Sequence, residues 1–126
     1  MLEHLRAQVV TALAGTSTVA LATHGPAGLL ISVFPCAAVG LCLYVRVPRT
    51  SDHLVNLEAD PEVSVATCRW QARGRARVVP RPERPDDLPL ASAPKADWYE
   101  LVEIRPVHVD IEHETGWGAA ETIEVE

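Results

Sequence analysis

Lysine is almost missing from this sequence. Among its 126 residues a single lysine, Lys95, accompanies ten arginines, and 17 acidic residues bring the net charge to −6. A chain with this balance lacks the basic surface that a general nucleic-acid binder needs. We therefore expect no nucleic-acid partner.

Long apolar runs are missing as well. A membrane-spanning helix needs roughly 18 consecutive apolar residues, and the best stretch, residues 29–45, is interrupted by Ser32, Pro35 and Gly40. The first residues carry no basic region ahead of an apolar core, as a secretory signal does. The sequence therefore predicts a cytoplasmic protein that does not contact membranes.

Several motifs that carry chemistry are also absent. The three cysteines, Cys36, Cys42 and Cys68, stand at no metal-binding spacing, and we expect small buried apolar residues at these positions. There is no glycine-rich dinucleotide fingerprint and no Walker loop. His108 and His113 lie on or after the last predicted strand, and His108 alternates with Val107 and Val109, which favours solvent-facing histidines over metal or haem ligands.

What the sequence does contain is enough apolar material for one globular domain spanning residues 1–126. Hydrophobic residues make up 48% of the chain, close to an ordinary soluble protein. Apolar periodicity and turn residues predict helices and strands as follows. The first predicted helix covers residues 2–13 and stops at Gly15. A second, short helix is capped by Thr50 or Ser51, has Leu54, Val55 and Leu57 on its apolar side, and ends at Asp60-Pro61. The predicted strands are residues 18–23, 29–34 (closed by Pro35), 41–47, 63–67, 69–78 and 99–111.

The strand at residues 69–78 alternates most clearly. Arginines 69, 73, 75 and 77, with Gln71, fall on one face, and Trp70, Ala72, Gly74, Ala76 and Val78 fall on the other. Trp70 on the apolar face is expected to be core. The arginine face fits either a solvated surface or contact with the acidic residues of a partner or a ligand phosphate.

Six strands and two short helices predict a mainly β fold, a small antiparallel barrel. Residues 80–98 form a proline-rich connection, residues 112–126 an acidic tail, and Pro106 marks an edge or a bulge. The strands at 29–34 and 41–47 are apolar on both faces, which is typical of a barrel wall covered by a dimer partner.

Four segments of the chain resemble the pyridoxamine 5'-phosphate oxidase-like family of FMN-binding split barrels, over about residues 5–111. They are residues 18–23 (TVALAT) with Ser32 on the next strand, residues 43–47 (LYVRV), residues 49–53 (RTSDH) with Asn56-Leu57 and residues 60–64 (DPEVS), and residues 74–79 (GRARVV). In the family, a lysine that holds the FMN phosphate stands at the position of His53, a basic residue at Asp52, and commonly a threonine at Val47.

This resemblance implies a six-stranded Greek-key split barrel that forms a homodimer, with two FMN sites at the interface built from both chains. It also implies a small flavin-dependent oxidoreductase acting on a small molecule. The alternative is a non-enzymatic relative that has lost tight flavin binding and binds another ligand or a protein. Haem handling, which occurs among relatives, is the third alternative.

The resemblance also assigns roles to particular residues. Arg49, Thr50, Ser51 and His53 would hold the phosphate at a helix N-terminus, a natural anion site, and Ser32 would line the flavin ring. Arg69 or Trp117 of the partner chain would close the site. The structural alternatives are that Ser51 or Thr50 only caps the helix beside Asp52, with His53 solvated, and that Trp117 only packs its tail onto the barrel.

Overall fold

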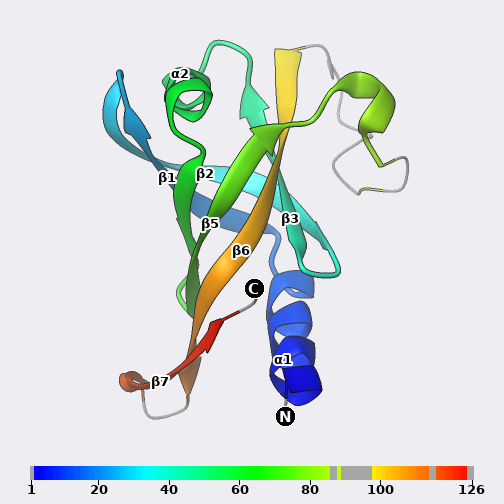
Figure 1. Ribbon diagram of the computed structural model, residues 1–126, viewed down its shortest axis with the longest axis vertical. Coiled ribbons are helices and arrows are strands. Elements are labelled where there is room, and N and C mark those ends of the chain that lie inside the picture. Colours follow the sequence, from blue (N-terminus) through cyan, green and yellow to red (C-terminus); the bar gives the residue numbers. More distant parts are fainter. Residues whose placement is uncertain (1, 86–87, 89–97, 114–115, 125–126) are drawn as a thin grey trace.

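Six antiparallel strands close into a barrel in the computed structural model, which describes residues 2–85, 88, 98–113 and 116–124 (Figure 1). The side chains of residues 2 and 5, and of residues 112 onward, lie outside the described part. The elements in chain order are α1 (Leu2–Ala14), β1 (Thr18–Gly25), β2 (Gly28–Val39), β3 (Cys42–Pro48), α2 (Asp52–Ala59), β4 (Glu62–Ala66), β5 (Trp70–Val78), the 3-10 turn η1 (Arg81–Glu83), β6 (Tyr99–His113) and β7 (Gly116–Glu124).

The strand order is β3-β2-β1-β4-β5-β6, and pairing of β3 with β6 closes the ring. The connection from β3 to β4 passes through α2 at one end of the barrel, while α1 lies at the other end (Figure 1). The predicted six-stranded barrel with two short helices is confirmed. None of the described helices is long and apolar enough to cross a membrane.

The seventh strand was not predicted, since residues 112–126 were expected to be a tail. The reason for β7 lies in the length of β6. One edge of β6 pairs with β3 only up to Ile104, and β7 pairs with the later part of the strand, from His108 onward. Without β7 that later edge would expose unpaired backbone groups, which proteins generally cover.

Alternate side chains of the strands fill the barrel interior. The buried cluster includes Val19, Leu21, Leu43, Val45, Val47, Val63, Val65, Ala72, Ala76, Val102, Ile104 and Val109. α1 adds Val9 and Leu13, so this helix closes one end of the core. Trp70 is buried as predicted, and its indole Nε1 donates to Thr16 Oγ1 at 3.1 Å. Val78, predicted on the same apolar face, is instead exposed at the end of β5.

Two prolines mark places where strand pairing changes. β2 was expected to end at Pro35 but continues to Val39. At Pro35 the strand leaves β1, and from Cys36 onward it pairs with β3, so the missing N–H falls where the partners change. The bulge expected at Pro106 is confirmed, because the register with β5 shifts between Arg73 and Gly74.

Two predictions about burial are wrong. α2 turns His53, Asn56 and Leu57 toward the protein, while Val55 is exposed, so the face that the helix buries is partly polar. Among the cysteines, Cys36 is buried, but Cys68 is exposed in the turn between β4 and β5. Both predictions assigned burial from residue type alone. In the structure, the burial of each side chain depends instead on which face of the helix packs against the protein and on where the turn lies.

Candidate functional site

The N-terminus of α2 is built by the loop that leaves β3. Ser51 is the N-cap residue, and its Oγ accepts a hydrogen bond from the backbone N–H of His53 at 3.2 Å. The backbone N–H of Ser51 in turn donates to the carbonyl of Pro48 at 2.9 Å. Arg49 and Thr50 are exposed just before this cap. The structure therefore brings an arginine and two hydroxyl side chains to one helix N-terminus.

A shallow hollow of about 440 Å³ lies beside this helix end, lined by Pro48, Arg49, Thr50, Trp98 and Tyr99. The backbone N–H of Arg49 donates to the carbonyl of Trp98 at 2.8 Å, which ties the loop to the start of β6. Trp98 is 62% exposed. An exposed aromatic ring beside an arginine and hydroxyl groups can meet both an aromatic and an anionic part of a ligand.

His53 points away from this hollow, into the protein. The residue is 2% exposed, and in its ring Nδ1 lies 2.7 Å from Thr23 Oγ1 and Nε2 lies 3.0 Å from Ser32 Oγ. Phe34 packs edge-on against the ring, with the centroids 5.3 Å apart. The prediction of a solvated His53 is therefore wrong. Both ring nitrogens already have hydroxyl partners, so His53 does not face a ligand phosphate in this arrangement.

The pKa of His53 lies below its ordinary value of 6.5 because burial disfavours the charged ring, an effect that the carboxylate of Asp52 partly offsets. The imidazole is therefore neutral at physiological pH. A neutral imidazole carries one donor and one acceptor nitrogen. One of the two nitrogens therefore donates to its neighbouring hydroxyl, and the other accepts from its own.

Asn56 was not predicted as a site residue, although it lies at the centre of the same polar cluster. It is fully buried, and its amide joins α2 to the turn between β1 and β2: Oδ1 accepts from the N–H of Ala27 at 2.9 Å, and Nδ2 donates to the carbonyl of Gly28 at 2.9 Å. A Cβ at Gly25 would come 2.8 Å from Oδ1. The signal available from sequence was the spacing of His53 and Asn56, which puts both on one helix face.

Of the two remaining predicted site residues, Arg69 is separated from this cluster. Arg69 lies in the β4–β5 turn, where it lines a hollow of about 450 Å³ together with residues at the end of α1, such as Gly15. Trp117 belongs to β7, and its side chain lies outside the described residues. One chain thus gathers Ser32, Arg49, Thr50, Ser51 and His53 at the α2 end of the barrel and holds Arg69 elsewhere.

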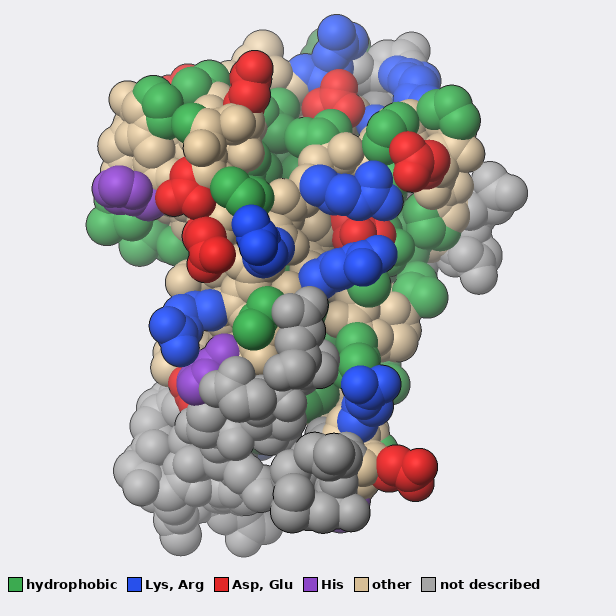
Figure 2. Space-filling model, viewed as in Figure 1, with side chains coloured by type: hydrophobic (Ala, Val, Ile, Leu, Met, Phe, Trp, Pro, Cys, Tyr) green, Lys and Arg blue, Asp and Glu red, His purple; other side chains and the backbone are tan. Residues whose placement is uncertain are grey.

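The arginine face of β5 carries its own ion pairs. Arg77 Nε lies 3.2 Å from a carboxylate oxygen of Glu103, and Arg77 also pairs with Glu83 at 3.6 Å. Figure 2 shows basic and acidic side chains interleaved on the face toward the viewer. The acidic partners of Arg77 are therefore supplied by the same chain.

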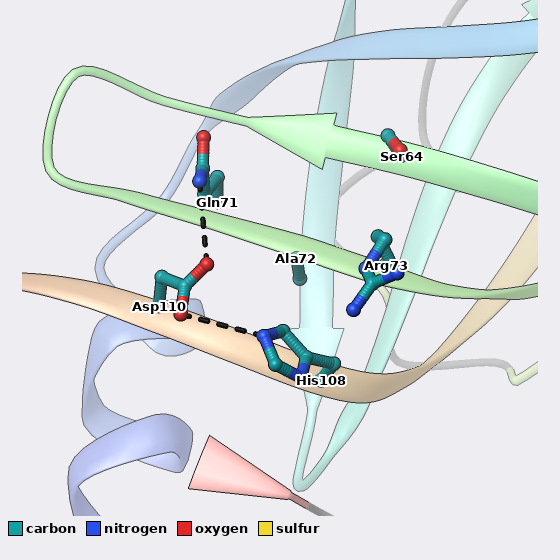
Figure 3. A pocket seen from close by; sticks show the side chains of 6 residues that line it. All are labelled: Ser64, Gln71, Ala72, Arg73, His108 and Asp110. Carbon is teal, nitrogen blue, oxygen red and sulfur yellow. Dashed lines mark hydrogen bonds and ion pairs between the residues drawn. The ribbon is translucent and has the colours of Figure 1, made fainter. Parts of the chain in front are cut away.

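A small polar hollow of about 190 Å³ lies farther along the same face, between β4, β5 and β6 (Figure 3). Asp110 accepts from Gln71 at 3.3 Å and lies 3.4 Å from His108 Nε2, with Arg73 close by (Figure 3). His108 thus contacts the carboxylate of Asp110 on the sheet surface. The side chain of His113 lies outside the described part of the chain.

Comparison with solved structures places this fold among split barrels. General stress protein 26 from Bacillus anthracis superposes with a TM-score of 0.71 at 20% identity, over 97% of this chain and 99% of that chain. A protein related to general stress protein 26, of the pyridoxinephosphate oxidase family, from Clostridium acetobutylicum superposes with a TM-score of 0.67 at 13% identity, over 98% and 96% of the two chains. An FAD-binding protein from Mesorhizobium loti reaches a TM-score of 0.63 at 14% identity, over 82% and 90%.

These similarities establish the split-barrel fold that the resemblance implied. No protein-family model and no curated protein matches the sequence. At such low identity the shared fold does not by itself specify a ligand or an activity. The residues at the α2 end of the barrel must carry any functional argument.

Proposed function

We propose that this protein binds FMN as a homodimeric split-barrel flavoprotein of the pyridoxamine 5'-phosphate oxidase-like family, and that it acts as a small flavin-dependent oxidoreductase. The observation that carries the proposal is the N-terminus of α2, where Arg49, Thr50 and Ser51 stand together in a fold shared with an FAD-binding structure. A cytoplasmic location, without nucleic-acid or membrane partners, stays a prediction.

The chemistry of the donors fits a phosphate group. A guanidinium can bind phosphate oxygens through paired hydrogen bonds, hydroxyls donate further ones, and the positive end of the helix dipole favours an anion at this place. The carboxylate of Asp52 in the first turn opposes this attraction. The phosphate would therefore be held by Arg49, Thr50 and Ser51, and His53 would not contact it.

The cofactor, when bound, supplies the redox chemistry, and the protein positions it and tunes its surroundings. Ser32 would line the flavin ring from β2, because its half-buried hydroxyl lies on the side of the strand that faces α2 and His53. Arg69 or Trp117 of a partner chain would close the site. Arg69 lies outside the α2 cluster of its own chain, which agrees with a site completed by a second copy.

An apolar stripe on β2 supports the homodimer. Leu29, Ile31 and Val33 point to the outer face of the strand and are 69%, 68% and 68% exposed in the single chain. Three large apolar residues in a row on one face are an unfavourable surface for an isolated protein and are typical of a protein interface. We therefore place the subunit contact on the outer face of β2.

The competing proposal is a relative that has lost tight flavin binding and serves another ligand or a protein. It is favoured by His53, since the position that carries the phosphate lysine in the family is here occupied by a side chain engaged inside the protein.

The visible absorbance spectrum of the protein distinguishes these proposals. It is recorded on the purified protein, and again after FMN is added and the mixture is passed through a gel-filtration column. Flavin bands that travel with the protein support FMN binding. A colourless protein that takes up no FMN at micromolar concentration contradicts it and favours the competing proposal. An intense Soret band would point to haem instead.

A further inference from the structure

Four polar side chains between α2 and the β1–β2 hairpin form one continuous chain of hydrogen bonds. Asn56 Nδ2 lies 3.1 Å from Thr23 Oγ1, Thr23 Oγ1 lies 2.7 Å from His53 Nδ1, and His53 Nε2 lies 3.0 Å from Ser32 Oγ. Asn56, Thr23 and His53 are buried, whereas Ser32 is half-buried. The chain therefore runs from the interior toward the surface.

The direction of the hydrogen bonds is fixed at the inner end by backbone groups. The N–H of Ala27 can only donate, so the atom of Asn56 that it meets must be the carbonyl oxygen Oδ1. The carbonyl of Gly28 can only accept, so the atom facing it must be Nδ2. With the amide held in this orientation, Asn56 Nδ2 donates its other proton to Thr23 Oγ1.

The donor and acceptor roles of Thr23, His53 and Ser32 follow in turn. Among the described residues, the hydroxyl proton of Thr23 has one acceptor within reach, His53 Nδ1, and a buried hydroxyl proton without an acceptor is unfavourable. Nδ1 therefore accepts, and the single proton of the neutral ring lies on Nε2, from which it is donated to Ser32 Oγ. The Ser32 hydroxyl accepts from inside and has its own proton left to donate outward.

We propose that Asn56, Thr23 and His53 form a polarised relay that leaves the Ser32 hydroxyl proton available for donation to the ligand. The ligand group that receives this proton is an acceptor, such as a carbonyl oxygen or an unprotonated ring nitrogen, both of which a flavin ring presents. This ligand consequence rests on the proposed flavin site. In this role Thr23 and His53 are positioning residues, and Ser32 is the specificity-determining contact.

The relay is tested first without any ligand. Nitrogen-15 NMR of the folded protein near neutral pH distinguishes a ring nitrogen that carries a proton from one that does not. We expect His53 Nε2 to be protonated and Nδ1 to be unprotonated, and the exposed His24 serves as the reference ring. A protonated Nδ1 in His53 would overturn the proposal.

The consequence for binding is tested by titrating FMN into variants that thermal melting shows to be folded. Removing one hydrogen bond with Ser32→Ala should weaken affinity about tenfold. Thr23→Val removes the donor that fixes the tautomer and should weaken affinity about two- to tenfold, whereas Thr23→Ser, which keeps the hydroxyl, should bind like the parent protein. The double variant Thr23→Val/Ser32→Ala should bind no more weakly than Ser32→Ala alone.

An additive loss in the double variant, or unchanged affinity in Thr23→Val together with a lowered melting temperature, would show that the cluster only stabilises the fold. If the parent protein binds no FMN at all, the proposed function fails, and the tautomer of His53 alone decides whether the relay exists.

Discussion

His53 occupies the position at which the FMN-binding split barrels that this chain resembles carry a phosphate-holding lysine. A lysine side chain is long enough to reach a ligand beyond the helix end, and its charge needs water or an anion. A histidine is shorter and can be buried neutral, and here its ring lies between two hydroxyls at hydrogen-bond distance. Under the proposed function, neighbours such as Arg49 would therefore hold the phosphate.

We predict that the protein loses stability in acid through His53. The pKa of the folded histidine is depressed below 6.5, so the unfolded chain binds more protons just below that pH. The contribution of the neutral ring is thus present above about pH 6.5 and is lost as the pH falls toward the folded pKa. Thermal melting between pH 8 and pH 5 should show the melting temperature falling, less steeply in His53→Gln. The exposed His24→Gln should melt like the parent; an equal pH dependence in His53→Gln would contradict this assignment.

Glu103 is a second residue whose effect can be predicted. This residue is only 5% exposed, and its carboxylate accepts from Tyr44 OH at 3.0 Å, Arg77 Nε at 3.2 Å and Arg105 Nε at 3.1 Å. Burial alone would raise the pKa of Glu103, but these three hydrogen bonds outweigh it and hold the pKa below 4.5. Burial and the hydrogen bond to Glu103 raise the pKa of Tyr44 to about 12.

Replacing Glu103 by alanine should cost about 2 kcal/mol of unfolding free energy, because the buried Tyr44 hydroxyl loses its acceptor. Tyr44→Phe, which removes the hydroxyl together with its need for a partner, should cost about 1 kcal/mol or less. Urea denaturation measures both. A loss in Tyr44→Phe as large as in Glu103→Ala would contradict this explanation.

At the scale of the elements, sequence periodicity predicted most of the barrel, because alternating burial is a local property of a strand. The alternation of β5 from Trp70 to Arg77 is an example. Two features depend on distant pairing and were not predicted: β2 continues past Pro35 because β3 takes over as its partner, and β7 forms because the later part of β6 has a vacant edge. No window of sequence around either segment contains that information.

The candidate site shows the same division. Ser51 as helix cap was predicted from local sequence, since capping involves only neighbouring residues. The contacts of His53 with Ser32 and Thr23 join residues 21 and 30 positions apart. They depend on how α2 packs on the hairpin, so the inward orientation of the ring could not be predicted.

Gly74 gives a prediction at this scale. A Cβ there would lie 2.4 Å from the carbonyl oxygen of Arg105 on the neighbouring strand, at the bulge opposite Pro106. Gly74→Ala should therefore force β5 and β6 apart and cost about 1–3 kcal/mol, the usual range for overpacking. Gly15→Ala is the matched control, since its Cβ would meet nothing closer than 3.7 Å. Equal melting temperatures for the two variants would contradict the close approach of these strands.

For the whole molecule, the exposed stripe on β2 is the feature that a single chain leaves unexplained. If Leu29, Ile31 and Val33 lie in the proposed subunit interface, a charge at Ile31 is buried without a partner when two copies associate. We expect Ile31→Glu to convert the protein from dimer to monomer in light-scattering measurements. Val39→Glu, at an exposed position near the end of the same strand, should stay dimeric. A monomeric parent protein would contradict the proposed homodimer, and a dimeric Ile31→Glu would place the interface elsewhere.

FMN and riboflavin differ only in the phosphate group, so a comparison of the two shows whether the N-terminus of α2 holds the phosphate of a flavin. Equilibrium titration followed by flavin fluorescence should give the parent protein a clear preference for FMN over riboflavin, by about tenfold or more. In Arg49→Gln the affinity for FMN should fall toward that for riboflavin, which should itself be unchanged. Equal affinities of the parent protein for the two flavins, or binding of neither, would contradict the account.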